Sequence, residues 1–73
     1  MEGGEKSTGT RDVQFNVVSV LYHALEAAST AEMYVRDAEE AGDQDLTAFF
    51  REAQESNRRL ADRAKEVLRQ RLA

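Results

Sequence analysis

The sequence predicts an all-α fold, an antiparallel two-helix hairpin that dimerises into a four-helix bundle. Three observations predict it. Proline is absent, so nothing breaks a helix. Apolar residues recur at three- and four-residue spacing over residues 13–41 and 46–72. A single glycine, Gly42, separates the two patterns, and a connection this short makes two helices antiparallel neighbours.

The length of 73 residues and the absence of cysteine bound the organisation of the chain. One domain this small needs staples or partners to gain more than a few kcal/mol of stability. Disulfides are excluded, so oligomerisation is the expected source of the additional stability. Residues 1–10 hold three of the four glycines and too little apolar surface to order themselves. We therefore expect a flexible N-terminal tail, followed by a helical hairpin over residues 11–73.

The first helix is expected over residues 12–41. Thr10 or Asp12 offers an N-cap oxygen, and Gly42 suits the left-handed position after the last turn. Two apolar stripes run along this helix at helical spacing. The first stripe is Val18, Leu21, Leu25, Ala28, Glu32 and Val35. The second is Val13, Val17, Val20, Ala24, Ala27, Ala31, Tyr34, Ala38 and Ala41.

One neighbouring helix cannot cover both stripes, so the second stripe should face another subunit. The small residues in it allow a like helix to approach closely across a two-fold axis. The predicted oligomer interface consists of Val17, Val20, Ala24, Ala27, Ala31 and Tyr34.

The second helix is expected over residues 44–72, with Asp43 as its N-cap. It carries one apolar band backed by a charged face. Folding the chain at the turn pairs residues whose numbers add to about 85, which sets Leu25 against Leu60. Two polar residues, Glu32 and Asn57, then fall on the packing stripes as a polar core. Register control explains such residues, and a functional polar site or partial exposure are the alternatives.

Two long helices joined by a tight turn carry, in the corresponding register, Met33-Tyr34, Ala38, Asp43, Leu46, Ala48 and Ala61. This pattern resembles the ferritin-like superfamily, and in particular the half-size encapsulated ferritins, over roughly residues 20–70. The resemblance implies hairpins that dimerise into a four-helix bundle around a di-iron site of carboxylates and a Glu-x-x-His pair. This chain has Ala27, Asn57 and Leu60 at those positions, so we expect neither a conventional ferroxidase site nor a cofactor.

An unconventional metal site between subunits stays open as an alternative. His23 and Glu26 lie one helical turn apart, and Glu32, Glu52 or Glu55 of a neighbouring subunit could add a ligand. A solvated polar helix face explains the same residues. No phosphate-binding glycine loop or catalytic triad is visible in the sequence, so we do not expect an enzyme.

The net charge of the chain and its distribution limit the classes of partner that we expect. The net charge of −4 argues against nucleic acid, and no apolar run is long enough to cross a membrane, so a cytoplasmic location is expected. Acidic residues dominate 13–43 and basic residues dominate 58–71, which favours a head-to-tail homodimer or higher oligomer. A basic strip at Arg58, Arg63 and Arg69 could dock an acidic protein. The sequence thus indicates a structural or interaction role, with metal handling as the alternative.

Overall fold

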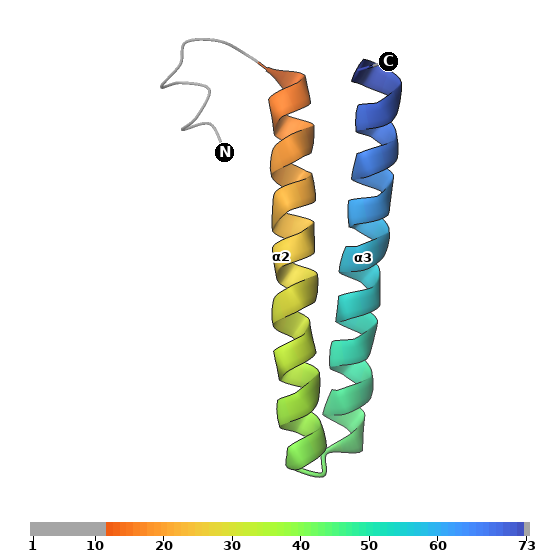
Figure 1. Ribbon diagram of the computed structural model, residues 1–73. Coiled ribbons are helices and arrows are strands. Elements are labelled where there is room, and N and C mark those ends of the chain that lie inside the picture. The colour runs from red at the N-terminus through yellow and green to blue at the C-terminus, as the bar shows by residue number, and fades with distance from the viewer. Residues whose placement is uncertain (1–11, 73) are drawn as a thin grey trace.

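The computed structural model describes residues 12–72, which form two antiparallel α-helices (Figure 1). Helix α2 spans Val13–Glu40 and helix α3 spans Gln44–Leu72. The predicted hairpin is confirmed, and the ends of both helices lie within one residue of the predicted ends. The predicted N-terminal tail lies outside the described residues.

Helix α2 begins at the cap that the sequence offers. Asp12 has an extended backbone, and its side chain accepts a hydrogen bond of 2.9 Å from the amide of Phe15. This bond satisfies one of the amides that a helix leaves without a partner in its first turn. Thr10, the other predicted cap, lies outside the described residues.

A Schellman motif ends α2 and sets the turn. The amide of Gly42 donates to the carbonyl of Glu39, and the amide of Asp43 donates to the carbonyl of Ala38, both at 3.0 Å. Gly42 adopts a φ of 72°, the left-handed conformation that glycine enters without steric cost. Asp43 then caps α3, because its Oδ1 accepts from the amide of Leu46 at 3.0 Å. Gly42 therefore ends α2, and the next residue, Asp43, is the N-cap of α3.

Small residues form the seam between the two helices. Their spacing of three and four residues is the pattern of a coiled-coil seam, and small side chains let two helix backbones approach closely. No side chain larger than valine is buried in α2. The buried residues of the seam are Ala24, Ala28, Ala31, Val35 and Ala38 of α2, and Thr47, Ala61 and Ala64 of α3.

The predicted register of α2 along α3 agrees with the structure. The predicted rotation of α2 about its own axis was wrong. The Gln14 side-chain amide reaches the carbonyl of Arg71 at 3.5 Å, as the predicted pairing requires. However, α2 is rotated so that its seam draws alternately from both predicted stripes. Ala24 enters the seam, whereas Leu25 turns outward and is 45% exposed. Alanine allows a closer approach to α3 than leucine does, and this favours the rotation.

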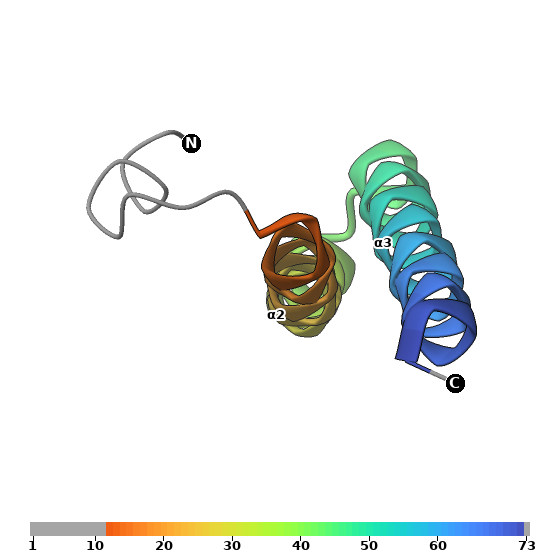
Figure 2. The same cartoon turned by 90° about the horizontal axis from the view of Figure 1, so that it is seen from above.

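The hairpin is one layer thick, so the seam leaves two long faces open (Figure 2). Each face takes the residues that follow one side of the seam at helical spacing. We call one the groove face, which carries Val20, Ala27, Tyr34, Phe49, Ala53, Leu60 and Val67. We call the other the ridge face, which carries Val18, Leu25, Arg58 and Lys65.

Candidate interaction surface

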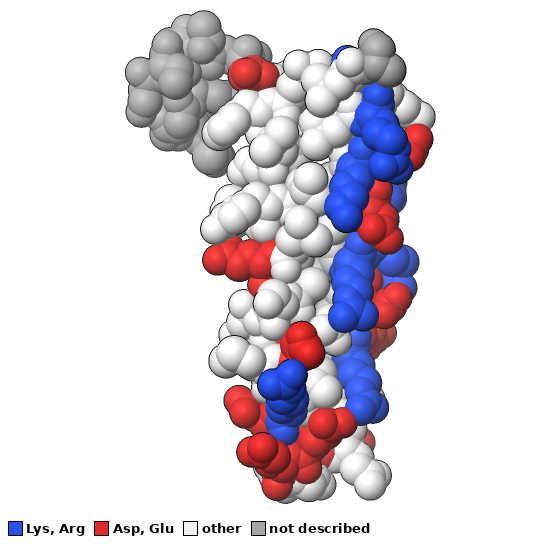
Figure 3. Space-filling view, viewed as in Figure 1, with Lys and Arg blue, Asp and Glu red and all other residues white. Residues whose placement is uncertain are grey.

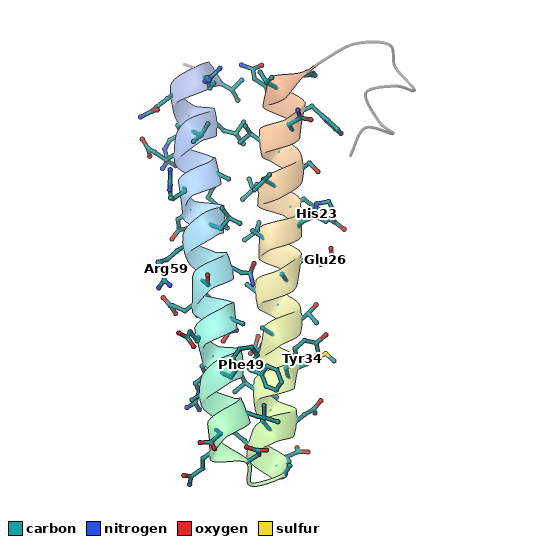
Figure 4. The ribbon with its side chains drawn as sticks, turned by 180° about the vertical axis from the view of Figure 1, so that it is seen from behind. His23, Glu26, Tyr34, Phe49 and Arg59 are labelled. Carbon is teal, nitrogen blue, oxygen red and sulfur yellow. The ribbon has the colours of Figure 1, made fainter. Side chains whose placement is uncertain are left out.

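Between the middle of the hairpin and the turn, the groove face is hollowed by an open apolar depression of about 430 Å³. Ala27 and Ala53 leave space at its floor, because neither side chain extends beyond Cβ. Tyr34 and Phe49 form its wall and point toward each other across the two helices (Figure 4). The two aromatic side chains are 46% and 58% exposed, respectively. Apolar surface of this kind gains stability when a partner removes it from water.

Aromatic contacts fix the shape of this wall. The Phe50 ring, half-buried at the seam, lies 5.5 Å from Tyr34 and 5.6 Å from Phe49 between ring centroids, at interplanar angles of 54° and 59°. Tilted packing at this distance is favourable for aromatic rings. These contacts favour the positions that the two exposed rings take on the groove face.

A second depression of about 260 Å³ continues the groove toward the chain ends. Its lining includes Val20 from α2, together with Leu60 and Val67 from α3. Val20 is 44% exposed and Leu60 is 46% exposed. Arg63 lies at its edge as the charged member of the lining. The two depressions together make a largely apolar surface along most of the hairpin.

The structure separates the predicted interface residues into two groups. Ala24 and Ala31 are buried within the hairpin at 3% and 4% exposure, so they offer a second subunit little surface, although Ala31 borders the depression on the groove face. Val20 and Tyr34 are exposed on the groove face, while Val17 and Ala27 are half-buried and line it. Four of the six predicted interface residues therefore present surface on the groove face.

Sequence reasoning missed the contribution of α3 to this surface. Phe49 and Phe50 are consecutive, and adjacent helical residues cannot both point into one seam. That spacing was the available signal that Phe49 lies outside the seam. Leu60 gave a weaker signal, because only its spacing of seven residues from Ala53 and Val67 places it on the same face.

The predicted polar core does not form inside the seam. Glu32 is exposed and pairs with Arg36 at 3.2 Å on the surface of α2, because the rotation of the helix turns it outward. Asn57 is half-buried, and its Nδ2 donates to the carbonyl of Ala53 at 2.9 Å. Within residues 12–72 no buried side-chain nitrogen or oxygen lacks a hydrogen-bond partner. These polar residues are therefore satisfied locally.

The three candidate metal ligands, His23, Glu26 and Glu32, do not come together in the hairpin. His23 and Glu26 lie at the outer edge of α2 (Figure 4), and both border the groove. Glu32 lies on the other side of the helix, paired with arginine. The His23 Nδ1 lies 2.8 Å from the carbonyl of Ser19, which fixes the ring against its own helix. Among the residues that the structure describes, no group of three or more histidine, aspartate or glutamate side chains could hold a metal ion.

Charge is segregated along the hairpin. Acidic side chains gather at the turn, and basic side chains run along α3 (Figure 3). The predicted strip of Arg58, Arg63 and Arg69 is divided between two surfaces. Arg63 follows Arg58 by five residues and lies about 140° away around the helix, at the groove. The helix positions of Arg58 and Arg63 therefore lie on different sides of α3, and docking of an acidic protein stays a prediction.

In the described part of the chain, no helix is long and apolar enough to cross a membrane. No family model, curated protein or solved structure matches this sequence. The resemblance to half-size encapsulated ferritins therefore remains an expectation from the sequence, and the geometry of the groove face is the strongest indication of function.

Proposed function

We propose that this chain is a non-catalytic, homo-oligomeric helical-bundle protein with a structural or protein-interaction role. Two hairpins pack together through their groove faces and form a four-helix bundle. Each copy thereby supplies the layer of side chains that the other lacks. The proposed partner is a second copy of this chain.

The observation that carries this proposal is that many large apolar side chains are exposed outside the seam, whereas the buried part of the seam holds small ones. Within residues 12–72, the buried hydrophobic residues are six alanines and one valine. By contrast, Tyr34, Phe49 and Leu60 are each close to half exposed or more. Fully burying one large apolar side chain is worth roughly 1.5 to 3 kcal/mol. A partner on the groove face therefore adds core that the hairpin alone does not have.

Matched substitutions on the two faces test the proposal. Leu60 on the groove face and Leu25 on the ridge face are 46% and 45% exposed, so glutamate should affect the isolated hairpin similarly at both positions. We expect Leu60→Glu to weaken self-association at least about 100-fold, because two carboxylates would be buried in one symmetric interface. Leu25→Glu should leave self-association within about threefold of the unmodified chain. Analytical ultracentrifugation measures both constants.

Two outcomes would contradict the proposal. Equal self-association by all three chains would show that the groove face is not the interface. Loss of association in Leu25→Glu alone would assign the interface to the ridge face. Circular dichroism of each variant serves as the control for helix content.

A further inference from the structure

We propose that two copies stack groove face to groove face in a head-to-tail orientation, with Ala27 of both copies at the two-fold axis. In this arrangement α2 packs antiparallel on the partner's α2, and α3 packs antiparallel on the partner's α3. The inference rests on the proposed homo-oligomer and adds its orientation and register. It also identifies which side chains meet.

Symmetry leaves two ways to stack one face on itself. If the two-fold axis runs along the helices, the two turns lie together and α2 faces the partner's α3. If the axis runs across the helices, the turns lie at opposite ends and each helix faces its own copy. In the second arrangement, residues at equal distances from a midpoint meet across the interface.

The two helices share one midpoint. Two contacts define the register of α2 along α3. The Gln14 side chain contacts the carbonyl of Arg71, and the Tyr34 ring contacts the Phe50 ring. By these two contacts Ala27, in the middle of α2, and Arg58, in the middle of α3, lie at the same height along the hairpin, although their side chains are on opposite faces. A two-fold axis at this level therefore gives full overlap of both helices with their copies.

Apolar residues on the groove face are placed symmetrically about this midpoint. Val20 and Tyr34 each lie seven residues from Ala27, so Val20 meets the partner's Tyr34. Phe49 and Val67 each lie nine residues from Arg58, so Phe49 meets the partner's Val67. In both pairs an aromatic ring faces a valine, which is a complementary combination of a large and a small side chain. Ala27 meets the partner's Ala27 and allows the helices to approach closely.

Charge favours the same orientation. The turn half, residues 28–57, has eight acidic and two basic residues. The other half, residues 12–27 and 58–72, has four acidic and six basic residues. A dimer with adjacent turns would place acid beside acid, whereas the head-to-tail dimer places the acidic half of one copy on the basic half of the other.

One charged pair at the edge of the interface illustrates this complementarity. Glu52 lies six residues before Arg58 and Arg63 lies five residues after it, so Glu52 lies beside the partner's Arg63. Neither side chain forms an ion pair of 4.0 Å or less among the described residues of its own chain. Each is therefore available to a partner.

Disulfide cross-linking tests the register directly, because the chain has no cysteine of its own. Ala27→Cys should form a disulfide-linked dimer on mild oxidation, since the two copies of residue 27 face each other. A mixture of Val20→Cys and Tyr34→Cys chains should give mostly the mixed disulfide. The control is Ala48→Cys, on the outer side of α3, which should stay unlinked. A linked Ala48→Cys dimer with Ala27→Cys unlinked would overturn the register.

Distances between spin labels at Ala41, beside the turn, test the orientation independently. Ala41 lies 14 residues from the midpoint, which places the two labels about 42 Å apart in the head-to-tail dimer. Adjacent turns would bring the labels within about 20 Å. A dimer with the shorter distance would overturn this inference and leave the proposed function standing. A monomer at micromolar concentration would overturn both.

Charge reversal supplies a third readout. Glu52→Arg and Arg63→Glu should each weaken the dimer roughly 3- to 10-fold at low salt, and the double variant should recover most of the loss. High salt should reduce all of these differences. The proposed pairing would be contradicted if the double variant lost as much association free energy as the two single variants lose together.

Discussion

Individual side chains decide which surface of α2 faces α3. Ala24 and Leu25 are neighbours on the predicted stripes, yet Ala24 is buried and Leu25 is close to half exposed. Leu25 was predicted in the seam and Ala24 at the oligomer interface, because helical spacing alone does not distinguish the two stripes. The choice depends on how closely α3 approaches, and Ala61 and Ala64 of that helix permit a short separation. Such matching across a seam is not visible in the periodicity of one helix.

Enlarging a seam alanine tests this explanation at the residue scale. We expect Ala24→Leu to lower the free energy of unfolding by about 1 to 3 kcal/mol, because the added carbons have no space between the helices. The exposed Ala48→Leu serves as a matched control and should change it by less than about 0.5 kcal/mol. Urea denaturation measures both. Equal stability of the two variants would mean that the seam is not closely packed at Ala24.

The helices themselves were predictable because their ends are encoded locally. Asp12 and Asp43 cap the first turns, and Gly42 ends α2. Each signal involves residues within five positions of the helix end, so no knowledge of the tertiary fold was needed. The groove face was only half predictable, since it combines Val20 and Tyr34 from one helix with side chains from the other.

The turn provides a prediction at the scale of the element. A Cβ added at Gly42 would meet no atom within 4 Å, so a substitution there costs only the strain of the left-handed backbone. We expect Gly42→Ala to reduce the free energy of unfolding by about 1 to 2 kcal/mol. Gly42→Asn should cost less, because asparagine tolerates this conformation better than alanine does. Thermal and urea denaturation report the difference.

Equal losses for the alanine and asparagine variants would contradict this account of the turn. The control for assembly is the association constant of each variant. It should stay unchanged, because Gly42 lies at the end of the hairpin and away from the groove face.

At the scale of the whole molecule, one hairpin cannot bury its own large apolar side chains. Its seam holds small residues, its groove face holds aromatic and aliphatic ones, and its charge is divided between its two ends. The excess of apolar surface on α2 was visible in the sequence as a second stripe. The exact surface was not, because it depends on the rotation of α2 in the seam. The proposed second copy would cover the groove face and set the acidic half of one hairpin against the basic half of the other.

Sedimentation equilibrium of the unmodified chain at micromolar concentration is the most direct test of this central claim. The account predicts a dimer, with twice the 8.2 kDa mass of one chain, or a higher oligomer built from such dimers. It also predicts that the oligomer dissociates when Leu60 is replaced by glutamate. A folded, fully helical monomer of 8.2 kDa under the same conditions would contradict the account.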